Sequence, residues 1–178
     1  MSKIPPAGSI GLVRIKGLVG QAIRVGQFLD GDGFRDFEHA FVLYQRGSSA
    51  ELCTVVEAEP RGARLAGLDE YKGRQVLWLS CPEQYAASML AAAVTYVGVP
   101  YSFTDYVTVA AHHLHLPVSK LLEYVVEHSH HVVCSQLVVA CADKAGWPLL
   151  PEHDWPGFVT PGRLAQLAAA DAEPTLVE

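Results

Sequence analysis

The sequence predicts an α+β domain in which an antiparallel sheet packs against helices. The first half of the chain contains short apolar runs of strand length, separated by turns rich in glycine, serine and proline. From Pro82 onward the pattern changes to alanine-rich stretches with apolar residues at helical spacing. Strands that cluster first and helices that follow are typical of α+β domains.

The composition indicates one domain with a sizeable core. The chain has 178 residues, of which 50% are hydrophobic and 18% are charged, so disorder is not expected. We expect a single domain over residues 1–178, with a loose tail from about residue 171. The formal net charge is −6 and the sequence has no Lys/Arg cluster, which argues against a nucleic-acid-binding protein.

Four segments of the first half have the length and composition of strands. They are Ser9–Lys16, His39–Gln45, Glu51–Ala58 and Gln75–Cys81. No helix-length segment separates the second strand from the third, so these two are expected to pair in an antiparallel arrangement. Between the first and the second strand, Gly17–Leu29 has apolar residues at helical spacing and predicts a helix.

The second half of the chain predicts five helices. The first four are Gln84–Val97, Phe103–Leu116, Val118–Glu127 and Val132–Ala145. Gly146 follows the fourth at the position of a left-handed C-cap. Thr160 before Pro161 has the pattern of an N-cap residue followed by proline in the first turn, and predicts a short final helix to about Ala170.

The sequence contains no pattern of a membrane span or of a secretory signal. The most apolar stretch, Tyr85–Tyr101, is interrupted by polar residues, glycine and proline, and the N-terminus has no sustained apolar segment before a small-residue cleavage site. The four cysteines form no CxxC pair, so neither a disulfide scaffold nor a thiolate zinc site is expected. These observations predict a cytoplasmic protein with reduced thiols.

Cys134 is the candidate nucleophile. It lies in the first turn of the helix predicted over Val132–Ala145, where unpaired N–H groups and the helix dipole favour a thiolate. The same N–H groups can stabilise an oxyanion. The alternative interpretation is a small core residue, which is what most free cysteines are. Cys141, two turns later in the same helix, is interpreted as core.

His39 and Glu57 are the candidate partners of this thiol, because a cysteine nucleophile needs a base and the base needs an orienting acceptor. His39 opens a predicted strand, which is a rigid support for an imidazole. Glu57 lies beside His39 if the two strands pair, and Glu59, two residues later on the same face, is an alternative acceptor. Each residue alone is more typical of a solvated surface. Together with Cys134 they supply the three groups that the chemistry requires.

The order histidine, glutamate, cysteine resembles that of the circularly permuted NlpC-type cysteine hydrolases, the YiiX-like branch of the papain-like superfamily. Six segments carry the resemblance in the family's order: Gly8–Val13, Glu38–Tyr44, Val55–Pro60, Gly98–Phe103, Val133–Leu137 and Thr160–Leu164. Carboxylates of the family's motifs are replaced here by Ser9, Ser102, Gln136 and Arg163. These departures bear on the substrate class more than on the reaction.

The resemblance implies a circularly permuted papain-like fold with a barrel-like sheet, and attack of Cys134 on an amide, ester or thioester carbonyl without a cofactor. His39 would hold the proton and return it, while Glu57 would fix the ring. The candidate substrate-binding residues are Tyr44, Tyr101 and Ser135. Peptides, including peptidoglycan stem peptides, protein amides and acyl lipids remain open as substrates. Acyl transfer, as in the related lecithin retinol acyltransferases, is an alternative to hydrolysis.

Two further hypotheses compete with the enzyme. Six histidines crowd two short stretches that flank one predicted helix: His112, His113, His115, His128, His130 and His131. His112 and His115 are one turn apart and would face a common metal ion, although helix caps or an exposed polar face explain the same clusters. The other hypothesis is a non-catalytic binding module of the same fold. The apolar stretch Tyr101–Val126 suits a lid or a lipid-facing wall, but helix packing on the sheet or a homodimer interface also explains it.

Overall fold

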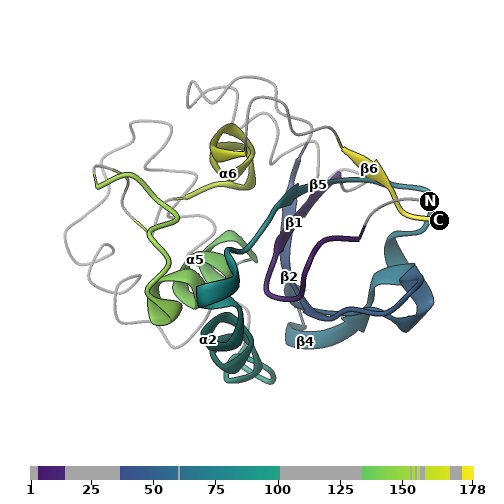
Figure 1. Cartoon of the computed structure of the whole chain (residues 1–178), viewed down its shortest axis with the longest axis horizontal. Coiled ribbons are helices and arrows are strands. Elements are labelled where there is room, and N and C mark those ends of the chain that lie inside the picture. Colours follow the sequence, from purple (N-terminus) through teal and green to yellow (C-terminus); the bar gives the residue numbers. More distant parts are fainter. Residues whose placement is uncertain are drawn as a thin grey trace.

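The computed structural model describes residues 4–14, 37–59, 61–100, 134–152, 154, 156, 159–168 and 174–178. In these residues a six-stranded antiparallel sheet and three α-helices form two layers, so the predicted α+β class is confirmed (Figure 1). The helices predicted over residues 17–29, 103–116 and 118–127 lie outside the described residues.

The sheet has the strand order β4-β3-β2-β1-β5-β6. The strands are β1 (Ile10–Val13), β2 (His39–Gln45), β3 (Thr54–Glu59), β4 (Gly62–Gly67), β5 (Gln75–Leu79) and β6 (Thr175–Leu176). β2 has the predicted bounds and pairs antiparallel with β3, as expected. β1 lies between β2 and β5 and pairs antiparallel with both, so the first strand of the chain is in the middle of the sheet.

Three details of the sheet differ from the prediction. The sequence of β4, GARLAG, has a glycine at each end and an arginine inside, so no apolar run marks it as a strand. The strand predicted from Glu51 begins later, because Ala50–Leu52 form a 3₁₀ turn, η1, beside the Cys53 thiol, which donates to the carbonyl of Ser49 at 3.2 Å. The predicted loose tail is wrong for residues 175–176, which pair with the free edge of β5.

The sheet of the described residues is not closed into a barrel, since β4 and β6 each pair on one side only. The predicted barrel-like closure is therefore wrong for this part of the chain. A hydrophobic cluster that includes Val55, Leu68 and Val177 packs against one face of the sheet. A second 3₁₀ turn, η2 (Leu68–Tyr71), contributes to this cluster. Val177 is tied to the turn after η2 by the Gly73 N–H, which donates to its carbonyl at 2.8 Å.

The helices gather on one side of the sheet (Figure 1). They are α2 (Glu83–Val94), α5 (Cys134–Ala145) and α6 (Pro161–Leu167). α5 packs against α2, β2 and β3 and shares a core with both layers that includes Val42, Val56, Met89, Leu137 and Val138. None of the described helices is both long enough and apolar enough to cross a bilayer.

Local sequence signals explain the ends of two helices. Gly146 has a φ of +72° directly after α5, which is the predicted left-handed C-cap. The Thr160 hydroxyl accepts a hydrogen bond from the Arg163 N–H at 2.9 Å, so Thr160 caps α6 as predicted. The described part of α5 begins at Cys134 itself.

Candidate active site

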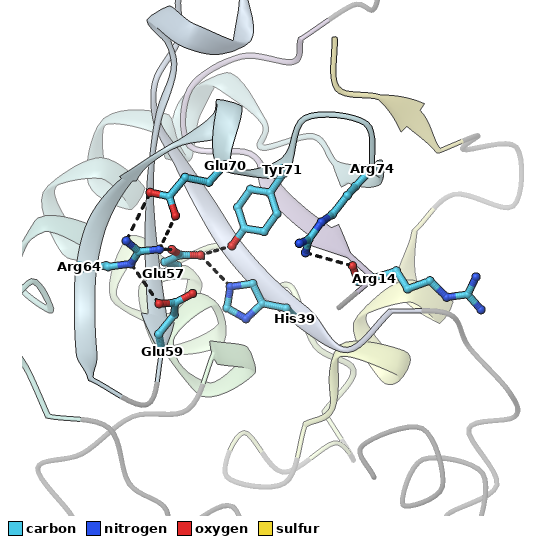
Figure 2. A network of polar contacts seen from close by, with 8 residues as sticks. All are labelled: Arg14, His39, Glu57, Glu59, Arg64, Glu70, Tyr71 and Arg74. Carbon is cyan, nitrogen blue, oxygen red and sulfur yellow. Dashed lines mark hydrogen bonds and ion pairs between the residues drawn. The ribbon is translucent and has the colours of Figure 1, made fainter. Parts of the chain in front are cut away.

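The pairing of β2 with β3 holds an imidazole against a carboxylate. Phe41 lies opposite Glu57 in the register of the two strands. His39, two residues before Phe41, therefore points to the same face and is the diagonal neighbour of Glu57. His39 Nε2 lies 2.8 Å from Glu57 Oε2. Figure 2 shows the two side chains pointing toward each other.

The N-terminus of α5 brings Cys134 to the same imidazole. The thiol lies close enough to the His39 ring for hydrogen bonding and charge between them to shift the pKa of both groups. Because His39 Nε2 faces Glu57, this arrangement leaves Nδ1 for the sulfur. The structure thus brings together the thiol, the imidazole and the carboxyl group that the sequence singled out, in the order Cys134, His39, Glu57.

The electrostatics of the first two groups favour an ion pair. Both residues are almost fully buried, with Cys134 8% and His39 5% exposed. Burial raises the pKa of Cys134, but the His39 hydrogen bond and charge, together with the N–H groups of Ala40 and Ser135, outweigh it and lower that pKa. Burial lowers the pKa of His39, whereas its interactions with Cys134 and Glu57 raise it to about 10. Both shifts favour a thiolate beside an imidazolium over a neutral thiol beside a neutral imidazole.

Glu57 is fully buried and its two oxygens have different partners. Oε2 is hydrogen-bonded to His39 Nε2 and accepts a second hydrogen bond from the phenol of Tyr71. Oε1 lies 2.8 Å from Nη2 of Arg64. Burial raises the pKa of Glu57, but the hydrogen bond and charge of His39, the Tyr71 hydrogen bond and the charge of Arg64 lower it below its ordinary value. The carboxylate is therefore ionised at neutral pH and oriented by three side chains (Figure 2).

The sequence did not single out Tyr71 and Arg64. Tyr71 lies on η2, and its ring stacks on His39 and Phe41 with centroid distances of 6.1 and 5.0 Å. Burial raises the pKa of Tyr71 well above its ordinary value, so the phenol remains a donor at physiological pH. Arg64 lies directly opposite Glu57 in the β3–β4 ladder. A cross-strand charge pair would have identified Arg64 if β4 had been recognised, whereas no sequence pattern links Tyr71 to Glu57.

The other predicted site residues lie elsewhere or have different contacts. Glu59 Oε2 lies 3.3 Å from Nε of Arg64, so Glu57, and not Glu59, is the carboxylate that contacts His39. Tyr44 packs against the helix-side core near the far end of β2, about 16 Å along the strand from His39. Ser135 is buried and places its N–H at the sulfur of Cys134. Tyr101 and the six clustered histidines lie outside the described residues.

The described residues contain no group of three or more histidine, cysteine, aspartate or glutamate side chains that could hold a metal ion. The site combines a thiol, an imidazole and a carboxylate with hydrogen-bond donors around them. This combination defines an α+β protein with a buried Cys–His–Glu arrangement at the start of a helix. No family model matches the chain, and no curated protein matches it either.

Proposed function

We propose that the chain is a cysteine hydrolase that cleaves an amide, ester or thioester bond through an acyl-enzyme on Cys134. The observation that carries the proposal is the position of one imidazole between a thiol with a lowered pKa and a buried carboxylate. Cysteine hydrolases use these three groups as nucleophile, acid–base and orienting residue. The resemblance to the permuted NlpC-type family, and its papain-like fold, is part of this proposal.

The proposed reaction has two steps. In the first, the Cys134 sulfur attacks the carbonyl carbon, the carbonyl electrons move to oxygen, and the backbone N–H groups near Cys134 stabilise the oxyanion. The intermediate collapses to a thioester as His39 gives its proton to the leaving amine, alcohol or thiol. In the second step, His39 takes a proton from water, the resulting hydroxide attacks the thioester, and the acid product leaves with Cys134 again as the thiolate.

The other cysteines offer internal controls for this role. Burial raises the pKa of Cys141 to about 12 and also raises the pKa of Cys81. Cys141 lies in the same helix as Cys134 and is fully buried. A thiol-directed reagent at neutral pH is therefore expected to modify Cys134 and to leave Cys141 unmodified.

The test uses p-nitrophenyl acetate as an activated acyl donor, with intact-mass and peptide mass spectrometry. We expect a hydroxylamine-sensitive acetyl thioester on Cys134 and catalytic release of p-nitrophenol. Cys134→Ala is expected to abolish both, and Cys141→Ala is the matched control that retains them. Acetylation that is equal in Cys134→Ala, or absent from Cys134 in the folded protein, would contradict the proposal. Repeating the reaction with an added amine or alcohol acceptor separates hydrolysis from acyl transfer.

A further inference from the structure

Arg64 connects the buried Cys–His–Glu arrangement to the protein surface. Its guanidinium lies among three carboxylates: Nη2 is 2.8 Å from Glu57 Oε1 and 2.7 Å from Glu70 Oε2, and Nε is 3.3 Å from Glu59 Oε2. The Arg64 side chain is 39% exposed, whereas Glu57 is fully buried. Figure 2 shows Arg64 between the Glu57 carboxylate and the surface residue Glu70.

The contacts of Arg64 with Glu59 and Glu70 are typical surface ion pairs, which contribute little to stability. Its contact with Glu57 is different, because an ionised carboxylate without solvent requires a charged or hydrogen-bonding partner for each oxygen. His39 and Tyr71 both contact Oε2, and Arg64 contacts Oε1. The β3–β4 register fixes this pairing by setting Glu57 and Arg64 directly opposite each other.

We propose that Arg64 is a positioning residue of the cysteine site, which keeps Glu57 ionised and turned so that Oε2 faces His39. The inference rests on the proposed function and extends it to a residue that does not touch the thiol. Through Glu57, Arg64 supports the imidazolium of His39, and through His39 it supports the thiolate of Cys134.

The charged and titratable groups around this chain of contacts come from several elements. Glu57 is faced by His39 from β2, Arg64 from β4 and Tyr71 from η2, and His39 is faced by Cys134 from α5. Arg64 is faced in addition by Glu59 from β3 and Glu70 from η2. Removing the positive charge of Arg64 raises the pKa of Glu57. Without Arg64, Glu57 therefore becomes neutral at a higher pH than in the wild type, and His39 loses its anionic acceptor at that higher pH.

The experiment measures the iodoacetamide alkylation rate of Cys134 between pH 5 and 9 by peptide mass spectrometry. We expect Arg64→Gln to move the acid-side loss of reactivity to higher pH, so that the ratio of the rates at pH 5 and pH 8 falls by about three- to tenfold, which corresponds to a displacement of half a unit to one unit. Arg64→Lys, which keeps the charge, is expected to restore most of the wild-type profile. Unfolding exposes Cys134 with an ordinary thiol pKa, so profiles are compared only under conditions in which the fully buried Cys141 stays unmodified in the same digests.

Two variants control for loss of charge at the surface. Glu70→Gln removes an exposed partner of Arg64 and leaves the Glu57 contact. Arg74→Gln removes an arginine that contacts the Tyr71 ring and the Arg14 carbonyl. Both are expected to keep the wild-type profile. If Arg64→Gln does not fold, Arg64→Met, which keeps the apolar stem without the charge, is measured in its place with the same expected shift of the profile to higher pH.

The outcomes separate the two proposals. If wild-type Cys134 loses reactivity tenfold per pH unit below about pH 8.5, as an unpaired thiol does, the proposed function is wrong. If the wild-type profile shows a lowered thiol pKa and the folded Arg64→Gln or Arg64→Met profile superimposes on it, only the positioning role is overturned.

Discussion

Removal of the Tyr71 hydroxyl is expected to destabilise the protein by weakening the support of Glu57. The phenol donates to Oε2 of a fully buried carboxylate, and hydrogen bonds to charged groups contribute about 1.5–3 kcal/mol each. Tyr71→Phe keeps the ring, and with it the stacking on His39 and Phe41. We therefore expect the free energy of unfolding at pH 7 to fall by about 1.5–3 kcal/mol, or the melting temperature by roughly 3–12 °C for a chain of this size.

The pH dependence of this loss follows from the direction of the Glu57 pKa shift. The folded state lowers the pKa of Glu57, so the stability that Glu57 contributes is present above its unfolded pKa of about 4.3 and is lost as pH falls through the lower folded value. The Tyr71 hydroxyl supports the ionised form. The difference between wild type and Tyr71→Phe is therefore expected to be largest near neutral pH and to shrink below about pH 4.

The measurement is urea unfolding followed by tryptophan fluorescence at pH 7 and at successively lower pH. Tyr44→Phe is the matched control, because Tyr44 is partly buried against the helix-side core and no carboxylate contact involves it among the described residues. We expect this control to change the free energy of unfolding by less than about 0.5 kcal/mol. Equal stability of Tyr71→Phe and wild type at pH 7, or a loss that grows toward acid pH, would refute the reasoning.

Two substitutions away from the site test the fold that holds it. Thr160→Ala removes the hydroxyl that accepts a hydrogen bond from the Arg163 N–H, and is expected to lower the free energy of unfolding in urea by about 1 kcal/mol. Thr160→Ser is expected to retain most of the stability, and equal losses in both variants would contradict the capping role. Gly11→Ala would place a methyl group against the rings of Phe41 and Trp78, and is expected to cost about 1–3 kcal/mol. Unchanged unfolding of Gly11→Ala would mean that these rings do not pack over β1.

Segments with a strong local pattern were predictable from the sequence. The apolar run of β2 marked its bounds correctly, and the cap residues Thr160 and Gly146 marked helix ends. β4 was missed because its burial depends on the pairing with β3 and not on its own apolar residues. The short strand β6 was missed for a similar reason, since only the free edge of β5 makes those residues a strand.

The candidate site shows the same limit. The residue types of Cys134, His39 and Glu57 led to the hypothesis of a cysteine hydrolase, but both Glu57 and Glu59 were open as acceptors because they share a face of one strand. The register that sets Phe41 opposite Glu57 decides between them, and register is a property of two strands together. The role of Tyr71 was not predictable from the sequence, because its contact with Glu57 depends on how η2, the turn after β4, is placed against the sheet.

The site is divided between two parts of the fold that are held by different forces. Backbone ladders fix the positions from which His39, Glu57 and Arg64 meet, since these residues come from three adjacent strands. Cys134 depends on side-chain packing, because α5 is held against the sheet by buried residues such as Leu137. The contact of the Ala40 N–H with the sulfur joins the two parts. The pairing of His39 with Glu57 is therefore preorganised by hydrogen-bonded backbone, and the position of the Cys134 thiol relative to it is set by how the helix packs on β2.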